Sequence, residues 1–282
     1  KDPTNGYASK ADNWSKNLVL ETMATYNKTF NRNHSLNVVA AFSYERGDYG
    51  NKAMVATGFP QDLTEDFDMS AAVNPQKPTS GRGMTSLVSF LGRANYNLMN
   101  KYLFTASFRR DGSSKFAPGN KWSNFASGAI AWRASEEQFI KDLNVFSNLK
   151  FRASYGQTGN QAIGAYATRD YLTVANYPIN GALASGFANL TWRGPANPDL
   201  KWETTSQYNV GVDMGFFQNR INLTIDLYYK KTSDLLQNIQ IPQSTGFSNM
   251  TTNFGNVTNK GLEITGKFYA ITGKNLNWDF DA

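Results

Sequence analysis

The sequence predicts an all-β protein: an antiparallel, up-and-down sheet that forms a segment of a transmembrane β-barrel. Apolar and polar residues alternate with a period of two along most of the 282 residues, as in strands with one apolar face. Most alternating segments are roughly 9–13 residues long, which suits strands that cross a bilayer at a tilt. The connections alternate between short and long, as they do when the two ends of a barrel face different compartments.

Each strand is predicted from the same alternation. In the first segment, Leu18 and Leu20 share one face while Glu21 lies on the other. Ten segments follow this pattern: 18–26, 36–45, 88–96, 102–109, 126–133, 151–155, 207–216, 221–230, 262–268 and 276–280. We therefore expect about ten antiparallel strands in one sheet, with an apolar and a polar face.

The connections predict the membrane setting more strongly than the strands do. Short turns are expected near 28–34, 97–101, 217–219 and 270–275, and long loops near 46–84, 111–121, 157–203 and 232–257. A soluble sandwich has no reason to sort its loops by length in this way. The connection 134–148 contains Ser135-Glu-Glu-Gln138, whose capping-box spacing predicts a short helix.

The composition excludes several classes of protein. The sequence has no run of about 18 apolar residues, the length that a membrane-spanning helix needs. The first residues lack the apolar core of a signal peptide. The chain has no cysteine and one histidine, His34, so thiolate and multi-histidine metal sites are impossible. We expect no catalytic residue, no metal and no cofactor. The net charge of +6 is spread over many strands without a recognised motif, so we expect no nucleic acid partner.

Several segments resemble one known family. They are GRANYNLMNKYLFTASFRRDGSSKF (92–116), WRASEEQFI (132–140), LKFRASYGQTGN (149–160), NPDLKWETT (197–205), DLYYKKTSDLL (226–236) and GNVTNKGLE (255–263). Together they resemble the barrel of SusC/RagA-type TonB-linked outer-membrane transporters of Bacteroidetes. The likeness is clear over residues 85–270.

The resemblance implies a location in the bacterial outer membrane and TonB-dependent import of a nutrient oligomer, either a glycan or a peptide. It implies a barrel of about 22 strands, so residues 1–282 are expected to be a partial barrel domain, with the plug and remaining strands outside this sequence. Implied partners are a SusD-like surface lipoprotein, the TonB complex through the missing regions, and outer-membrane lipid. The alternative is a soluble extracellular β-rich carbohydrate-binding module, in which Val210, Val212, Leu223, Ile225 and Leu262 would pack into an enclosed core.

Charged residues on the polar face are the first group of candidate site residues. We expect eight to face the barrel lumen: Arg93, Arg109, Arg133, Arg152, Asp213, Asp226, Glu263 and Lys267. Opposite charges among them can pair with one another or with a plug, although they can also simply solvate a wet interior. A glycosidase carboxylate pair is disfavoured, because no local motif singles out two of them.

Aromatic residues in the long loops are the second group. Those expected to contact a ligand or partner are Tyr166, Tyr171, Tyr177, Phe187, Trp192 and Phe247. The alternative is that long loops pack their aromatic residues into small cores of their own. We expect the segment from Asn197 to Glu203 to be structural, with Asn197-Pro198 opening a turn and Trp202 anchoring the loop.

Overall fold

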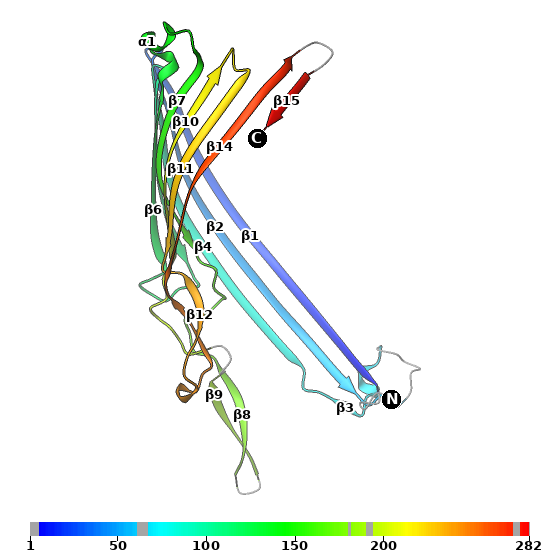
Figure 1. Cartoon of the computed structure of the whole chain (residues 1–282). Coiled ribbons are helices and arrows are strands. Elements are labelled where there is room, and N and C mark those ends of the chain that lie inside the picture. Colours follow the sequence, from blue (N-terminus) through cyan, green and yellow to red (C-terminus); the bar gives the residue numbers. More distant parts are fainter. Residues whose placement is uncertain (1–5, 61–66, 180–181, 190–193, 273–276, 282) are drawn as a thin grey trace. The chain divides into compact units, whose positions relative to one another are not determined.

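A computed structural model describes residues 6–60, 67–179, 182–189, 194–272 and 277–281 (Figure 1). Within these residues, no helix has both the length and the apolar character needed to cross a membrane. The structure is dominated by one large antiparallel sheet, and the loops carry two small hairpins and a few short helices.

The strands of the large sheet follow one another in chain order. Their bounds are β1 (Tyr7–Phe30), β2 (His34–Thr57), β4 (Thr79–Leu98), β5 (Tyr102–Ser113), β6 (Trp122–Arg133), β7 (Phe146–Asn160), β10 (Glu203–Phe216), β11 (Ile221–Ser233), β14 (Asn256–Thr272) and β15 (Asn277–Asp281). The short β3 (Asn74–Pro75) pairs with β2. Every segment predicted from alternation is a strand of this sheet, which confirms the predicted fold class.

Two hairpins lie within the long connections. β8 (Leu172–Ile179) pairs with β9 (Ala182–Asn189), and β12 (Leu236–Gln240) pairs with β13 (Asn249–Asn253). Single 3-10 turns occur at η1 (Met69–Ala71), η2 (Ala134–Glu136) and η4 (Gln243–Thr245). The short turns are confirmed at 31–33, 99–101 and 217–220, whereas most of the turn expected at 270–275 lies outside the described residues.

The first three strands are longer than predicted. β1 and β2 have 24 residues each and β4 has 20, so the long loop expected at 46–84 is wrong in its bounds. Glycines and charges near the loop end of these strands disguised the strand pattern. Gly50 lies beneath the Trp14 ring, where a Cβ atom would come within 2.8 Å of the indole. The glycine therefore makes room for a cross-strand aromatic residue and does not form a turn.

The helix predicted after β6 is present as α1 (Gln138–Lys141), directly after η2. The predicted capping box does not form. The residue that precedes α1 is Glu137, and its side chain makes no hydrogen bond to the helix backbone. Its carboxylate is instead bound by side chains from the neighbouring strands, as described below.

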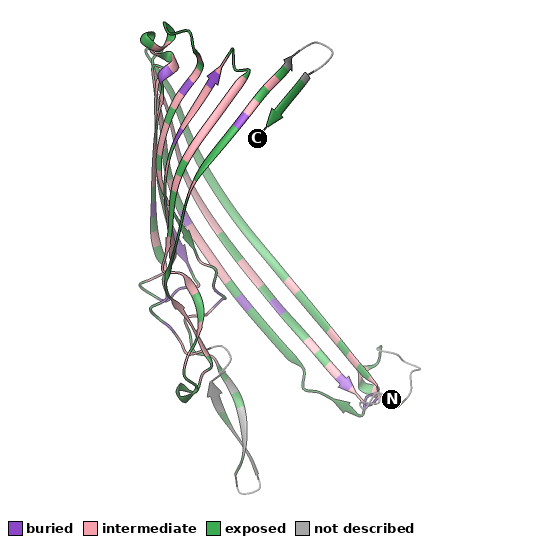
Figure 2. Ribbon diagram, in the orientation of Figure 1, coloured by how far each residue is buried: buried purple, intermediate pink, exposed green. Residues whose placement is uncertain are grey.

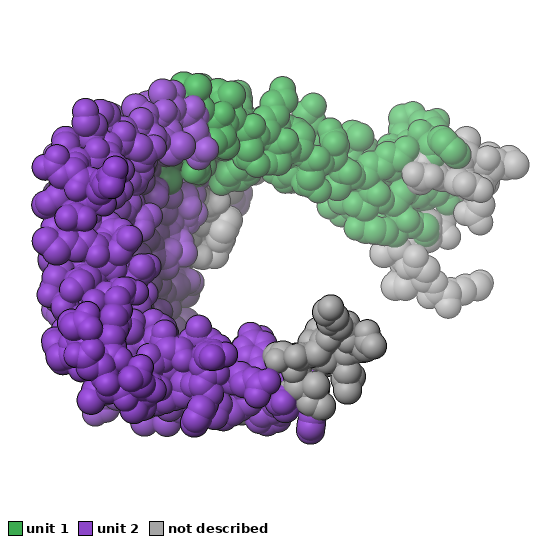
Figure 3. All heavy atoms as spheres, turned by 90° about the horizontal axis from the view of Figure 1, so that it is seen from above, with its two compact units in different colours: residues 1–20, 44–87 green, residues 21–43, 88–282 purple. Residues whose placement is uncertain are grey.

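The chain divides into two compact units, residues 1–20 with 44–87 and residues 21–43 with 88–282, which we call units 1 and 2. Unit 2 contains the strands from β5 to β15 and curves as a thin wall in Figure 3. Its apolar rows are open to solvent (Figure 2): Val210, Leu227, Leu262 and Ile264 are between 57% and 59% exposed. This distribution is the reverse of that in a soluble domain.

The structure does not show the enclosed apolar core that a soluble module would need. Val210 and Leu262 are exposed, and Val212, Leu223 and Ile225 are only half-buried. These side chains therefore do not form an enclosed core. Four buried apolar side chains of unit 2 gather where the long loops meet the strands: Phe116, Phe125, Leu200 and Trp202.

Candidate functional site

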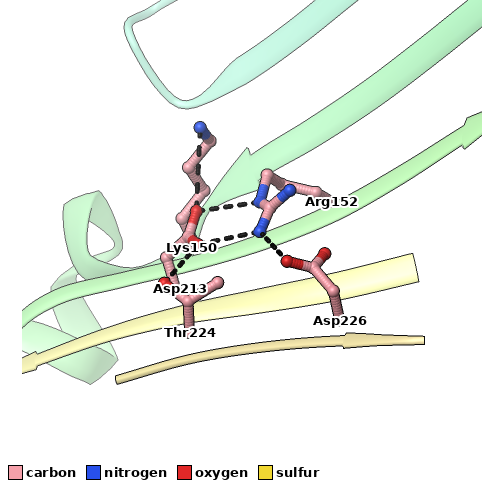
Figure 4. Close-up of polar contacts among 5 residues, drawn as sticks. All are labelled: Lys150, Arg152, Asp213, Thr224 and Asp226. Carbon is pink, nitrogen blue, oxygen red and sulfur yellow. Dashed lines mark hydrogen bonds and ion pairs between the residues drawn. The ribbon is translucent and has the colours of Figure 1, made fainter. Parts of the chain in front are cut away.

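An ion-pair network crosses the polar face of unit 2 over three neighbouring strands (Figure 4). Arg152 on β7 donates from Nε and Nη2 to the two carboxylate oxygens of Asp213 on β10, each at 2.9 Å. Its Nη2 also donates to Asp226 Oδ2 on β11 at 3.1 Å. Lys150 Nζ lies 3.9 Å from Asp213 Oδ2, and Thr224 Oγ1 donates to Asp213 Oδ1 at 3.2 Å. One guanidinium therefore joins three strands through bidentate, charge-assisted bonds.

A glycine makes the longer of these bonds possible. Gly211 lies between Arg152 and Asp226 in the sheet register, paired with both. A Cβ atom at Gly211 would collide with Asp226 Oδ1 and lie 3.0 Å from Arg152 Nη2. Because Gly211 has no side chain, the Arg152 guanidinium can extend past it and reach Asp226 on the third strand.

Replacing Gly211 with alanine is therefore expected to break the Arg152–Asp226 bond and destabilise the sheet by about 1.5–3 kcal/mol, the usual contribution of a hydrogen bond to a charged group. Urea unfolding of the refolded receptor measures the change. Gly128→Ala is the matched control, because the nearest atom to its added Cβ would be Thr105 O at 3.8 Å. Equal losses for the two variants would contradict this role for Gly211.

A second polar group lies on β4 and β5. Arg109 donates from Nε to both oxygens of Asp111, at 2.7 and 2.9 Å, and from Nη2 to Ser89 Oγ at 3.2 Å. Ser89 and Asp111 are buried. The carboxylate of Asp111 is thus held in a fixed position by a cation on the same strand.

The structure pairs five of the eight charges predicted to face the lumen. Arg109, Arg152, Asp213 and Asp226 belong to the two groups above, and Lys267 Nζ lies 3.5 Å from both Asp279 and Asp281 on β15. The other three, Arg93, Arg133 and Glu263, are exposed and form no ion pair or side-chain hydrogen bond with the residues that the structure describes. The paired groups join neighbouring strands, and Arg133 interacts electrostatically with Glu136. That the eight residues face a lumen stays a prediction.

Beyond this wall, asparagine side chains hold the long loops together. Asn197 Oδ1 accepts from Asp199 N at 3.1 Å, and its Nδ2 donates to Thr251 O at 2.9 Å. Asn253 exchanges two bonds of 2.9 Å with the backbone of Lys201. The turn expected at Asn197-Pro198 is therefore present, and it ties the loop before β10 to the hairpin after β11.

Trp202 anchors this loop as the sequence predicted. The indole is 5% exposed, and its Nε1 donates to Lys121 O at 3.0 Å. Ring centroids of Phe116 and Phe125 lie 5.3 and 5.7 Å from it. Together with Leu200 these side chains form the loop core, the small apolar core that supports the long loops.

The structure describes only some of the loop aromatic side chains that were predicted to contact a ligand or partner. Tyr166, Tyr171 and Phe247 are half-buried. The guanidinium of Arg169 lies 5.7 Å from the ring centroid of Tyr166. Tyr177 and Phe187 belong to the backbone of β8 and β9, but their side chains lie outside the description, as does the whole of Trp192. Their contacts with a ligand or partner stay a prediction.

The third polar group, at the short-turn end, was not predicted. Glu137 Oε2 accepts from Lys101 Nζ at 2.7 Å, and Oε1 accepts from Tyr102 OH at 2.8 Å and Trp132 Nε1 at 3.4 Å. The hydrogen bond from Lys101 is the largest cause that holds the pKa of Glu137 below its ordinary value of 4.5. Glu137 therefore ties the connection after β6 to the ends of two strands.

A lowered carboxyl pKa predicts a pH dependence with a definite sign. The Glu137 contribution to stability is complete above about pH 4.5 and is lost as the pH falls through the lower folded-state pKa. We expect Glu137→Gln to lower the melting temperature of the receptor at pH 7. The difference in melting temperature between this variant and the parent should disappear below pH 4. A gap that stays constant from pH 7 to pH 3 would contradict the charge-dependent role.

Sequence reasoning missed Lys150, Thr224, Gly211 and Glu137 as members of these groups. An isolated glycine within the strand pattern at 211 was the one available signal, since such glycines mark close approach. The cross-strand partners depend on register, which alternation alone does not provide.

The comparisons with known proteins decide the family. A model of the TonB dependent receptor-like β-barrel matches residues 2–282. The chain belongs to this family. Receptors of this family reside in the bacterial outer membrane, so the predicted location and family are confirmed.

Sequence relatives agree with this assignment. The chain is 40% identical over 232 residues to TonB-dependent receptor P39 of Formosa agariphila, covering 82% of this chain and 22% of that protein. It is 42% identical over 172 residues to TonB-dependent receptor SusC of Bacteroides thetaiotaomicron, covering 59% of this chain and 17% of that protein. The chain thus spans about a quarter or less of the curated relatives it matches.

Solved structures show the same fold. A chain of the RagAB peptide importer in its closed-closed state superposes with a TM-score of 0.84 at 26% identity, covering 95% of this chain and 29% of that one. The open-open state gives a TM-score of 0.82 at 27% identity, covering 96% and 29%. The ten strands in chain order are therefore part of a TonB-dependent receptor barrel.

Proposed function

We propose that the receptor carrying this chain imports a nutrient oligomer, a glycan or a peptide, across the outer membrane in a TonB-dependent way. The observation that carries this proposal is the division of the sheet into two faces. The apolar rows of unit 2 are open to their surroundings, while the other face holds an ordered network of charges. A wall of this kind separates lipid from an aqueous passage.

The polar face supports the role of a passage wall rather than that of an active site. Asp213 and Asp226 are both engaged by Arg152, so neither is a free carboxylate of the kind that glycoside hydrolysis requires. We propose that Arg93, Arg133 and Glu263 face the lumen as unpaired charges. The whole wall is proposed as the partial barrel domain of a longer protein that supplies a plug.

The partners follow from the family. RagAB is a peptide importer by name, which supports peptides as one substrate class. A surface lipoprotein of the SusD type is proposed as the lid of this receptor, as the resemblance to SusC/RagA-type transporters implies. The loop core beneath the long loops provides a stable base for such a lid. The loop aromatic residues Tyr166, Tyr171 and Phe247 are proposed to contact the lid or the substrate.

The test is to purify the full-length receptor with its lipoprotein and identify the oligomer that co-elutes by mass spectrometry. Separate treatments with a protease and a glycosidase distinguish a peptide from a glycan. Uptake of the labelled oligomer should stop in cells that lack TonB. Uptake that continues without TonB, or a complex that never carries an oligomer, would contradict the proposal.

Site variants refine the test. Arg93→Gln combined with Glu263→Gln should change the rate of uptake while leaving the amount of receptor in the outer membrane unchanged, because neither side chain supports the wall. Unchanged uptake of every oligomer that the receptor carries would remove these two residues from the passage.

A further inference from the structure

The two hairpins of the long loops differ in how their backbone is covered. In the β12–β13 hairpin, β13 lies against the segment that leads to β10. Asn197 Nδ2 in that segment donates to Thr251 O at 2.9 Å, and a Cβ atom at Gly194 would collide with Asn249 O. Backbone groups of β13 are therefore already in contact with another part of the chain.

The β8–β9 hairpin has no such cover among the residues that the structure describes. Its ladder runs without a register shift from the pair Leu172–Asn189 to the pair Ile179–Ala182, and the two strands form a sheet of their own (Figure 1). No backbone hydrogen bond joins either strand to another described segment. Leu172, Val174 and Ile179 are between 57% and 61% exposed. Because an isolated two-stranded hairpin is only marginally stable in water, a further strand would stabilise it.

The outer edge of β9 lacks the features that usually block the addition of another strand. Charged side chains, prolines and bulges are the common ones. β8 contains Pro178, which has no N–H to offer, whereas β9 has the sequence ALASGFAN, with neither a proline nor a charged residue. In an antiparallel pair, alternate residues of a strand direct their N–H and C=O groups away from the partner strand. β9 therefore offers a row of donors and acceptors along its outer edge.

Donors and acceptors at strand spacing match an extended polypeptide backbone. A glycan has no backbone that repeats N–H and C=O groups at this spacing. The hairpin lies in the connection between β7 and β10, on the long-loop side, which is the outer side of such barrels. No residue from 171 to 192 is charged, so this segment repels neither acidic nor basic peptides.

We propose that the outer edge of β9 (Ala182–Asn189) binds a peptide oligomer by strand addition. This proposal rests on the import function proposed above and selects a peptide over a glycan. Backbone hydrogen bonds to β9 hold peptides of different sequences, because such bonds do not depend on the side chains of the peptide. Tyr177 and Phe187, which the sequence predicts to contact a ligand, belong to the two strands of this hairpin.

The first experiment tests how the backbone of a peptide is used. The probe is a fluorescein-labelled, eight-residue peptide of alternating threonine and valine, bound to the full-length receptor with its lipoprotein and followed by fluorescence anisotropy. An analogue N-methylated at alternate residues has one blocked edge and one free edge, so it should bind as well as the probe. An analogue N-methylated at two adjacent central residues has both edges blocked. It should bind about tenfold more weakly, the loss expected from one or two backbone hydrogen bonds.

Hydrogen exchange then locates the bound probe. Exchange of the amides at 182–189 should slow when the probe binds, whereas the amides at 249–253, in the covered strand β13, are the matched control and should not change. Ala184→Pro with Ser185→Pro removes one N–H from each edge of β9 and should weaken binding of the probe about tenfold. The melting temperature of the receptor should stay unchanged, because no described backbone hydrogen bond joins this hairpin to the wall.

Four outcomes would overturn this assignment and leave the import function standing. Equal losses for both analogues would show a peptide enclosed on all sides, and no loss for either would show recognition through side chains. Binding of the probe without slower exchange at 182–189 would place the peptide elsewhere. Slow exchange at 182–189 before the probe is added would assign the edge to the lipoprotein or to a second receptor. Failure of import itself is shown separately, by uptake that does not depend on TonB.

Discussion

Replacing Trp202 with alanine is expected to destabilise the loop end of the sheet by about 3–5 kcal/mol, the usual cost of removing a large aromatic side chain from a core. The indole is 5% exposed and contacts Phe116 and Phe125. Its loss also leaves Lys121 O without its side-chain donor. The damage should be confined to the loop core, because the strand ladder does not depend on it.

Two controls make the Trp202 experiment specific. Trp202→Phe keeps most of the ring volume and loses the Nε1 donor, so it should cost less than the alanine variant. Phe254→Ala removes a loop aromatic that is 62% exposed and should cost little. Limited proteolysis of the loops in intact cells, followed by thermal unfolding, measures the series. Equal protease sensitivity of Trp202→Ala and Phe254→Ala would contradict the existence of the loop core.

The second large effect is expected from Ile264→Arg, which should disfavour assembly into the membrane by about 2–4 kcal/mol. Ile264 lies on the exposed apolar row of β14, and its register partner Ile225 continues that row on β11. An arginine there would have to enter hydrocarbon. Thr265→Arg is the control, since Thr265 is the next residue along the strand and is exposed on the polar face.

Refolding into phosphatidylcholine vesicles, followed by urea titration, compares Ile264→Arg with Thr265→Arg. Thr265→Arg should unfold within about 1 kcal/mol of the parent, as expected for an exposed polar position. If both variants lose stability to the same extent, the two faces of the sheet do not differ in the way described.

Strand positions and faces were predictable because alternation is a local property of the sequence. Leu227 and Leu262 lie on the exposed apolar rows where the pattern placed them. Strand ends were less predictable. Asp111-Gly112 resembles a turn in sequence, yet it continues β5 because Gly112 makes room for the Trp122 ring of the neighbouring strand.

The charged groups were predictable only in part. Arg152, Asp213 and Asp226 could be assigned to the polar face from sequence, but not to one network, because a network needs the register of three strands and the gap at Gly211. The contacts of the Glu137 carboxylate were not predictable for a different reason. Its spacing from Ser135 suggests a capping role, whereas Lys101 and Tyr102, over thirty residues earlier in the chain, bind its carboxylate.

The central claim is that one face of the sheet meets lipid and the other meets water. Single cysteines introduced along β11 test it directly, because the chain contains no cysteine of its own. Spin labels at 223, 225 and 227 in vesicles should be relaxed by oxygen, which concentrates in lipid. Labels at 224 and 226 should be relaxed by a water-soluble nickel chelate. Labels at 223, 225 and 227 that neither reagent reaches would show an enclosed core and contradict the account.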